Sequence, residues 1–207
     1  MNLSRPSPDQ SFRITIIGSV DQRRRNYEPV IEAFRQLTPL LNRPVILSLL
    51  GKSAGKYATE VIQKLKSLGS DNFKLESFDE VVPQDVFDAV MSNTHLILSP
   101  VNLKNSTEIF GEIYGQTKIS GSLLDVLRFP KITILPAGYN LDGIFKNYFD
   151  QYSDPRELKD IMLKFITQEH LVDEKTALIK KIIESKFTAS TLANQFVSTI
   201  KTLSLPK

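Results

Sequence analysis

The 207-residue sequence contains no cysteine and only two histidines. Without cysteine the chain can form neither a disulfide bond nor a thiol nucleophile, and its composition suits a reducing compartment such as the cytoplasm. His95 begins an apolar segment, and His170 lies in a polar segment between two expected helices. Because the two histidines are far apart in the sequence, a histidine-based metal site is not expected.

The sequence also lacks a large excess of one charge and a long apolar run. Lysine and arginine number 26 against 23 aspartates and glutamates, which gives a net charge of +3. That is too little positive charge to predict nucleic-acid binding, and no apolar stretch approaches the length that crosses a bilayer. The first ten residues lack the hydrophobic segment of a signal peptide. We therefore expect a cytoplasmic protein.

Short apolar runs alternate along the chain with amphipathic segments. Buried strands are predicted at 12–20, 44–51, 73–78, 95–101 and 131–135, with a weaker sixth at 147–151. Helices are predicted at about 28–41, 57–68, 83–92, 123–129, 155–167, 173–186 and 189–203. This alternation predicts an α/β domain. We expect a Rossmann-like parallel sheet of about six strands, with helices on both faces and extra helices at the C-terminus.

The length of the chain suits one large domain. We expect residues 12–207 to form it, and residues 1–11 to be a disordered leader or the edge of a cloned fragment.

The segment 112–136 carries the strongest indication of a site. Ser120, Gly121 and Ser122 open a predicted helix, whose free N–H groups attract anions and whose glycine lets a phosphate approach the backbone. Asp125 lies one turn further, where a carboxylate could accept hydrogen bonds from sugar hydroxyls. A capping box made by Ser122 and Asp125 explains the same residues without a ligand. The residues alone leave both interpretations open.

Four loops are expected at the carboxyl edge of the sheet, where ligands of such folds bind. They cover residues 21–27, 51–56, 102–118 and 137–143. Two of them are basic, so we expect a phosphorylated ligand. The 51–56 segment, GKSAGK, is not a P-loop, because three residues separate its glycines instead of four. Arg23, Arg24 and Arg25 are consecutive and cannot all face one ligand; a solvated charge run is the alternative.

Three segments of the sequence resemble the C-terminal half of a GT-B glycosyltransferase. The first, IIGSVDQRRRNYEPVIEAF, resembles that family's opening strand, glycine turn, basic residue and helix. The second, ISGSLLDVLRFPKITILPAGY, is similar to the Ser-Gly helix and following strand of the peptidoglycan GlcNAc transferase. The third is YFDQYSDPRELKDIMLKFI, followed by KFTASTLANQF, and it resembles the family's closing segment. The resemblance covers nearly all of residues 12–203.

The resemblance implies that the domain binds a nucleoside-diphosphate sugar as donor substrate, with no cofactor and no metal. The diphosphate would lie against the glycine turn and one basic residue, and the ribose would lie against Asp125, where the family usually has glutamate. Counting from either end of the first segment places the basic residue at Arg24 or at Arg25, and both remain open. The implied substrate-binding residues are Gly18, Ser19, Arg24, Arg25, Lys118, Ser120, Gly121 and Asp125, with Glu108 and Glu112 on the sugar side.

The resemblance also implies a second, acceptor-binding domain or partner subunit, through which the protein could contact a membrane peripherally. Only about 11 residues precede the first predicted strand, and no general base is recognisable, so the catalytic residues stay unassigned. The chain would be an excised domain, a subunit completed by another chain, or a module without chemistry.

Two other functions compete with this one. A non-catalytic interaction or regulatory module could use the same fold. The aromatic residues expected near the cleft suit either a base-stacking pocket or a protein surface; they are Tyr114, Tyr139, Phe145, Phe149 and Tyr152. An oxidoreductase that uses a dinucleotide is disfavoured, because Gly18 stands alone without the triple-glycine fingerprint.

Overall fold

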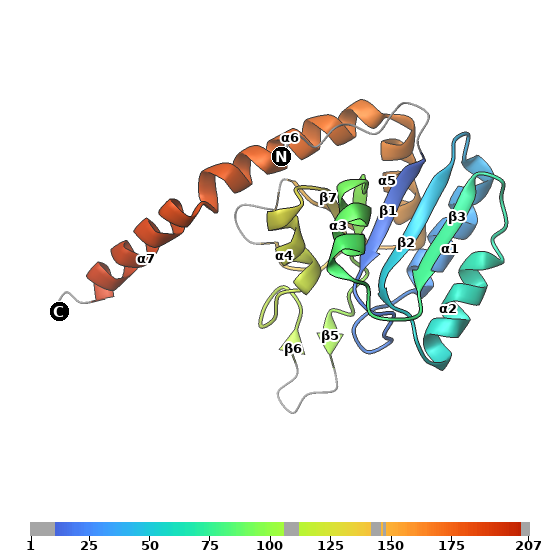
Figure 1. Cartoon of the computed structure of the whole chain (residues 1–207), viewed down its shortest axis with the longest axis horizontal. Coiled ribbons are helices and arrows are strands. Elements are labelled where there is room, and N and C mark those ends of the chain that lie inside the picture. Colours follow the sequence, from blue (N-terminus) through green and yellow to red (C-terminus); the bar gives the residue numbers. More distant parts are fainter. Residues whose placement is uncertain (1–10, 106–111, 142–145, 147, 204–207) are drawn as a thin grey trace.

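A computed structural model describes residues 11–105, 112–141, 146 and 148–203. Its centre is a sheet of six parallel strands in the order β3-β2-β1-β4-β7-β8 (Figure 1). The strands are β1 (Phe12–Ile17), β2 (Val45–Lys52), β3 (Phe73–Phe78), β4 (Leu96–Leu98), β7 (Ile132–Pro136) and β8 (Asp150–Tyr152). The predicted Rossmann-like fold is therefore confirmed. The strand order reverses between β1 and β4, and this places a ligand crevice at their carboxyl ends.

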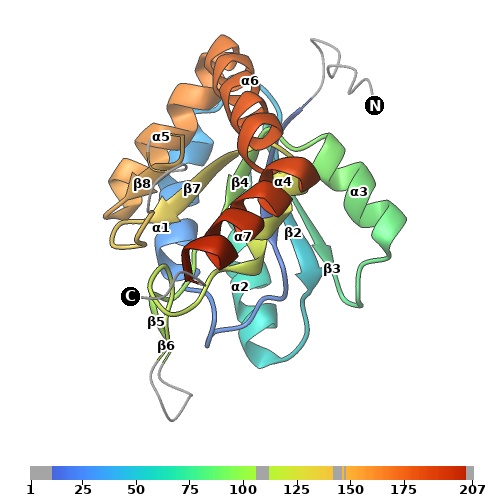
Figure 2. The same cartoon turned by 90° about the vertical axis from the view of Figure 1, so that its left-hand side faces the viewer.

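Helices cover both faces of the sheet (Figure 2). On one face lie α1 (Glu28–Leu37), α2 (Lys56–Lys66) and α5 (Pro155–Thr167), and on the other lie α3 (Gln84–Ser92) and α4 (Gly121–Arg128). The central strands are apolar and buried on both faces, as their continuous runs predict: β4 is buried at every residue, and β1 at all but Arg13. The core lies between these two helical layers.

Two further helices follow α5. The first, α6 (Glu169–Lys186), crosses the end of the sheet, and the second, α7 (Ala189–Leu203), continues away from the body of the domain (Figure 1). The helical conformation is interrupted between them, at Phe187 and Thr188. Thr188 then caps α7, because its Oγ1 accepts the backbone N–H of Thr191 at 3.1 Å.

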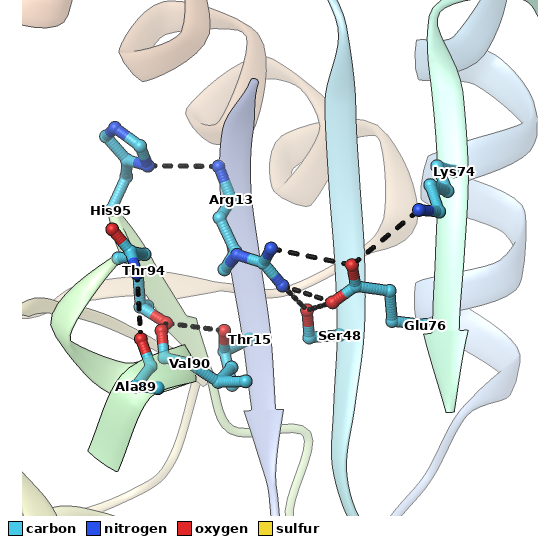
Figure 3. Close-up of polar contacts among 10 residues, drawn as sticks. Arg13, Thr15, Ser48, Lys74, Glu76, Ala89, Val90, Thr94 and His95 are labelled. Atoms are coloured by element: carbon cyan, nitrogen blue, oxygen red, sulfur yellow. Dashed lines mark hydrogen bonds and ion pairs between the residues drawn. The ribbon is translucent and has the colours of Figure 1, made fainter. Parts of the chain in front are cut away.

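Polar side chains occupy part of the sheet face that carries α3. The Arg13 guanidinium spans β2, where it donates to Ser48 Oγ at 2.6 Å, and it pairs with Glu76 on β3 (Figure 3). The hydroxyls of Thr15 and Thr94 form a buried bond of 2.7 Å beside it. Each polar group finds a partner, so this cluster joins three strands without leaving a buried group unsatisfied.

Several predicted boundaries were wrong. The first helix ends at Leu37 and passes into a 3-10 turn (Thr38–Leu40), because Pro39 has no N–H with which to continue the helix. The fourth strand covers only Leu96–Leu98, and α6 begins at Glu169, so His170 lies in a helix and not in a loop. The predicted loop 102–118 contains a small antiparallel pair, β5 (Lys104–Asn105) and β6 (Glu112–Ile113).

Candidate functional site

Two glycines, Gly18 in the turn after β1 and Gly51 in β2, let this turn pack closely against β2. Gly18 has a φ of +93°, a conformation that favours glycine, and its N–H donates to Leu50 O at 2.8 Å. Gly51 packs so closely on this turn that a Cβ at position 51 would lie 2.3 Å from the Gly18 carbonyl carbon. The tight strand-to-helix turn at Gly18 and Ser19 is thus set by close backbone packing.

The segment that follows this turn is joined to the end of β4. The N–H of Asn26 donates to Pro100 O at 2.8 Å, and the N–H of Asn102 donates to Arg24 O at 2.9 Å. Between these bonds, Arg25 and Val101 form an antiparallel bridge. The loops after β1 and β4 therefore meet at the point where the strand order reverses.

Adjacent arginines in this segment have different environments. The Arg25 guanidinium turns inward and donates to Ser19 O at 2.8 Å and to Ile17 O at 2.5 Å. Burial lowers the pKa of Arg25, and the nearby phenols of Tyr27 and Tyr114 oppose this shift. Arg24 has a side chain that is 66% exposed, and its Nε lies 3.9 Å from Asp21. Arg25 thus holds the glycine turn, while Arg24 extends from the rim.

Three serine hydroxyls organise the start of α4. Ser120 Oγ lies 2.8 Å from Ser122 Oγ, which in turn lies 2.8 Å from Ser99 Oγ at the end of β4. The backbone N–H of Ser120 donates to the Tyr139 hydroxyl at 3.2 Å. The three serines are buried, so this chain of bonds fixes the helix start to the sheet.

The capping-box interpretation of this helix start was wrong. The N-cap is Ser120 and not Ser122, and its side chain makes no capping hydrogen bond. Ser122 lies inside the first turn, where its hydroxyl is engaged by the other two serines. The box therefore cannot form, and the N–H groups that open the helix are not capped by Ser122 and Asp125.

Gly121 and Asp125 lie on the same side of α4, one turn apart. Gly121 is exposed, and a Cβ at that position would meet no heavy atom within 4 Å, so the space beside it is open. Burial raises the pKa of Asp125, which Arg128 opposes. Within the part of the chain that the structure describes, the Asp125 carboxylate has no hydrogen-bond or ion-pair partner. The helix start can thus offer N–H donors and a carboxylate to one ligand.

The remaining predicted site residues belong to neither of these two groups. Lys118 ends the turn after β6, with its Nζ 5.8 Å from the centre of the Tyr114 ring. Glu112 lies in β6, paired with Asn105, and Glu108 lies outside the described residues. The structure therefore brings Gly18, Ser19 and Arg25 together at the β1 turn, and Ser120, Gly121 and Asp125 together at α4.

The predicted aromatic platform is part of the core. Tyr114, Tyr139, Phe149 and Tyr152 are each at most 6% exposed, and Phe145 lies outside the described residues. Tyr139 supports the α4 start from within, a role that its place after a predicted strand did not reveal. The contribution of Ser99 and Ser122 was missed as well, because hydroxyl contacts between distant segments leave no local pattern.

Two cavities flank this region. One of about 480 Å³ lies between residues 19–23 of the β1 turn and a basic segment that includes Lys52 and Lys56. The other, of about 490 Å³, lies beside Leu123, Leu124 and Leu127 of α4 and is mostly apolar. Among the described residues, no group of three or more His, Asp or Glu is placed to hold a metal ion. No helix in that part of the chain is long and apolar enough to cross a membrane.

Comparison with known proteins identifies the fold. No protein-family model matches the sequence, and no curated protein matches it. Solved structures do. The C-terminal domain of a glycosyl transferase group 1 family protein (LpcC) from Francisella tularensis has a TM-score of 0.62 at 12% identity, over 86% of this chain and 87% of that one. HepE from Anabaena, solved with UDP and glucose, has a TM-score of 0.62 at 16% identity.

The lengths of the matched chains differ. The HepE match covers 99% of this chain but 54% of HepE. The catalytic domain of cholesterol-α-glucosyltransferase from Helicobacter pylori has a TM-score of 0.58 at 12% identity, over 86% of this chain and 98% of that one. This chain therefore has the fold of the C-terminal domains of GT-B glycosyltransferases, and it spans about half the length of HepE.

Proposed function

We propose that this chain, with the fold of a GT-B C-terminal domain, is the donor-binding half of a glycosyltransferase and binds a nucleoside-diphosphate sugar. The observation that carries the proposal is the start of α4, where Gly121 opens onto free space. On the same side, the Asp125 carboxylate has no hydrogen-bond or ion-pair partner among the described residues. HepE, a protein of similar fold, was solved with UDP and glucose.

The proposed binding mode uses the backbone for the phosphates. The first N–H groups of α4 and the positive end of its dipole stabilise the diphosphate, which approaches closely because Gly121 has no side chain. Arg24 supplies an exposed positive charge from the rim of the β1 turn. Backbone N–H groups that the fold holds in place, such as those at the start of α4, stabilise a diphosphate leaving group. Asp125 accepts hydrogen bonds from the ribose hydroxyls, which satisfies a half-buried carboxylate.

The proposal includes a partner that binds the acceptor. The chain corresponds to about half of HepE, and no described residue at the site is assigned as a general base. The acceptor-binding half would be a further domain or a separate subunit. This chain alone is expected to bind the donor and to transfer no sugar.

Replacing Gly121 with alanine tests the binding mode. The added methyl group meets no protein atom, so the fold should tolerate it, and alanine should even stabilise the helix by up to about 1 kcal/mol. It would, however, occupy the space proposed for the phosphates. We expect the affinity for UDP, GDP, ADP or TDP, measured by isothermal titration calorimetry, to fall at least about tenfold.

Gly69→Ala is the matched control. Gly69 is also exposed, adopts no positive φ and has only one heavy atom at 4.0 Å from an added Cβ, but it follows α2 away from the site. It should leave affinity unchanged. Equal binding by the wild type and Gly121→Ala would refute the role of the helix start, and no binding of any nucleoside diphosphate would refute the donor function.

A non-catalytic interaction module is the second candidate. It is favoured by the apolar side chains that α7 leaves exposed, among them Phe196 at 67%. If calorimetry detects no binding of any nucleoside diphosphate, the interaction module becomes the favoured function.

A further inference from the structure

Asn102 lies just beyond β4, at the point where the loops after β1 and β4 meet. Its side-chain amide donates a hydrogen bond to the carbonyl of Gln22 at 2.6 Å and to that of Arg23 at 3.4 Å. Its backbone N–H donates to the carbonyl of Arg24 at 2.9 Å. One half-buried residue therefore bonds to three consecutive carbonyls of the turn that carries the arginines.

The middle of this turn, residues 22–24, depends on hydrogen bonds for its position. These three residues are exposed, so burial contributes little to holding them. Asp21 shapes the turn from within: its carboxylate accepts the N–H of Arg23 at 2.8 Å, and its carbonyl accepts the N–H of Arg24 at 3.2 Å. Those bonds are local to the turn. The bonds from Asn102 join the middle of the turn to the end of a central strand.

The same strand end also holds the start of α4. The hydroxyl of Ser99, three residues before Asn102, lies 2.8 Å from the hydroxyl of Ser122 in the first turn of that helix. Residues 99–102 therefore contact both parts of the proposed diphosphate site, the basic turn on one side and the helix start on the other. This short segment sets the spacing between the backbone of Arg24 and the first N–H groups of α4.

We propose that Asn102 is a positioning residue for diphosphate binding, which holds the exposed turn so that the Arg24 guanidinium reaches the same ligand as the start of α4. This inference rests on the proposed donor function. Arg24 has a long, exposed side chain, and ordering such a chain and its loop on a phosphate reduces the affinity. A turn whose backbone is already fixed lowers that cost. Asn102 acts through the turn and does not itself contact the diphosphate.

Asn102→Ala tests this role. It removes the side-chain amide and leaves the backbone bond to the Arg24 carbonyl in place. We expect the affinity for the nucleoside diphosphate that binds the wild type best to fall about fivefold, because the turn must then be ordered on binding. Isothermal titration calorimetry of the full chain with UDP, GDP, ADP and TDP measures this change, and circular dichroism verifies that the variant is folded.

Asn72→Ala is the matched control. Asn72 is also half-buried, and its Nδ2 donates to the carbonyl of Leu41 at 2.9 Å, but it precedes β3 at the opposite edge of the sheet. Both substitutions remove an amide that donates to a backbone carbonyl, so both should lower the midpoint of urea denaturation to a similar extent. Only Asn102→Ala should weaken nucleotide binding, which separates a positioning role from a purely structural one.

The Arg24→Ala background shows whether Asn102 acts through Arg24. In that background the turn has no Arg24 guanidinium to place, so adding Asn102→Ala should change the affinity by less than about twofold. A loss of about fivefold in both backgrounds would overturn the proposal, because Asn102 would then affect the ligand without Arg24.

Two other results would overturn the role of Asn102 while the donor function stands. One is a wild type that binds a nucleoside diphosphate and an Asn102→Ala variant that binds it equally well. The other is unchanged affinity in Arg24→Ala, because the turn would then hold no cation that the ligand uses. If the wild type binds no nucleoside diphosphate at all, the donor function is refuted, and the role of Asn102 is refuted with it.

Discussion

Arg24 and Arg25 illustrate how neighbouring residues can divide structural and binding roles. Arg25 satisfies the carbonyls of Ile17 and Ser19 from a half-buried position, whereas Arg24 is two-thirds exposed. Hydrogen bonds that involve a charged group contribute about 1.5–3 kcal/mol each. The contribution of Arg25 should therefore appear in stability, and that of Arg24 in ligand binding.

We expect Arg25→Ala to lower the free energy of unfolding by about 2 kcal/mol, because two carbonyls of the glycine turn lose their donor. Arg24→Ala should change it by less than about 0.5 kcal/mol and instead weaken diphosphate binding. Urea denaturation and calorimetry on both variants separate the effects. Loss of stability in Arg24→Ala with none in Arg25→Ala would show that the two roles are reversed.

A second residue-scale feature is the hydroxyl of Tyr27. It is buried, and among the described residues it has no hydrogen-bond partner. Burial raises the pKa of Tyr27, so the phenol stays protonated at neutral pH. An unsatisfied buried donor costs about 1–3 kcal/mol.

Tyr27→Phe should therefore raise the free energy of unfolding by about 1 kcal/mol, measured by urea denaturation. Tyr57→Phe, at the ring that meets Tyr27 edge-on, is the comparison variant, because Tyr57 is only half-buried. A Tyr27→Phe protein less stable than the wild type would mean that the hydroxyl has a partner, such as a bound water.

At the scale of elements, α6 is tied to the sheet end opposite the candidate site. Glu169 in its first turn accepts a hydrogen bond from Arg43 at 2.8 Å and lies 3.9 Å from His95 Nε2. His95 stacks on Phe12, and its Nδ1 accepts the N–H of Arg13 at 3.0 Å (Figure 3). This cluster joins β1, the start of β4 and α6.

Acid should weaken this junction through His95. Burial lowers the pKa of His95 from 6.5 to about 4; Lys131, Arg43 and Arg13 add to the shift, and Glu169 opposes it. Above pH 6.5 the histidine is neutral in both states. Between pH 6.5 and about 4 the unfolded chain binds a proton that the folded chain does not, so stability falls as the pH is lowered.

We expect His95 to lower the free energy of unfolding by roughly 3 kcal/mol between pH 6.5 and 4. Chemical denaturation at a series of pH values measures this loss. His95→Asn keeps an acceptor near the Nδ1 position but cannot take up a proton. Its stability should decline less over that range. Parallel declines in the two proteins would mean that other groups, and not His95, control acid stability.

At the scale of the whole molecule, the doubly wound sheet gathers the site from distant segments. The β1 turn, the end of β4 and the start of α4 meet where the strand order reverses. The loops that join them are held by backbone hydrogen bonds such as Asn102 N–H to Arg24 O. A site of this kind depends on the complete sheet, so it should be lost on global unfolding and regained with it.

The exposed α7 is also a property of the whole molecule. Its apolar side chains Leu192, Phe196, Val197 and Ile200 are between 46% and 67% exposed. The HepE match covers nearly all of this chain, and HepE continues beyond it.

Alternation of apolar runs and amphipathic segments was enough to predict the fold class, because parallel strands are buried on both faces and helices on one. The same local signals located the glycine turn at Gly18 and the helix start near Gly121. They did not place the N-cap correctly, since Ser120 and Ser122 are equally plausible caps until the contact with Ser99 is known.

The sequence by itself determined which residues could be buried and where the chain could turn, because these follow from neighbours along the chain. The tertiary structure alone decided the direction of Arg25, the serine contacts across 23 residues and the half-buried position of Asp125. Those features depend on which carbonyls and hydroxyls the folded sheet brings within hydrogen-bonding distance. The local sequence pattern does not indicate such long-range distances.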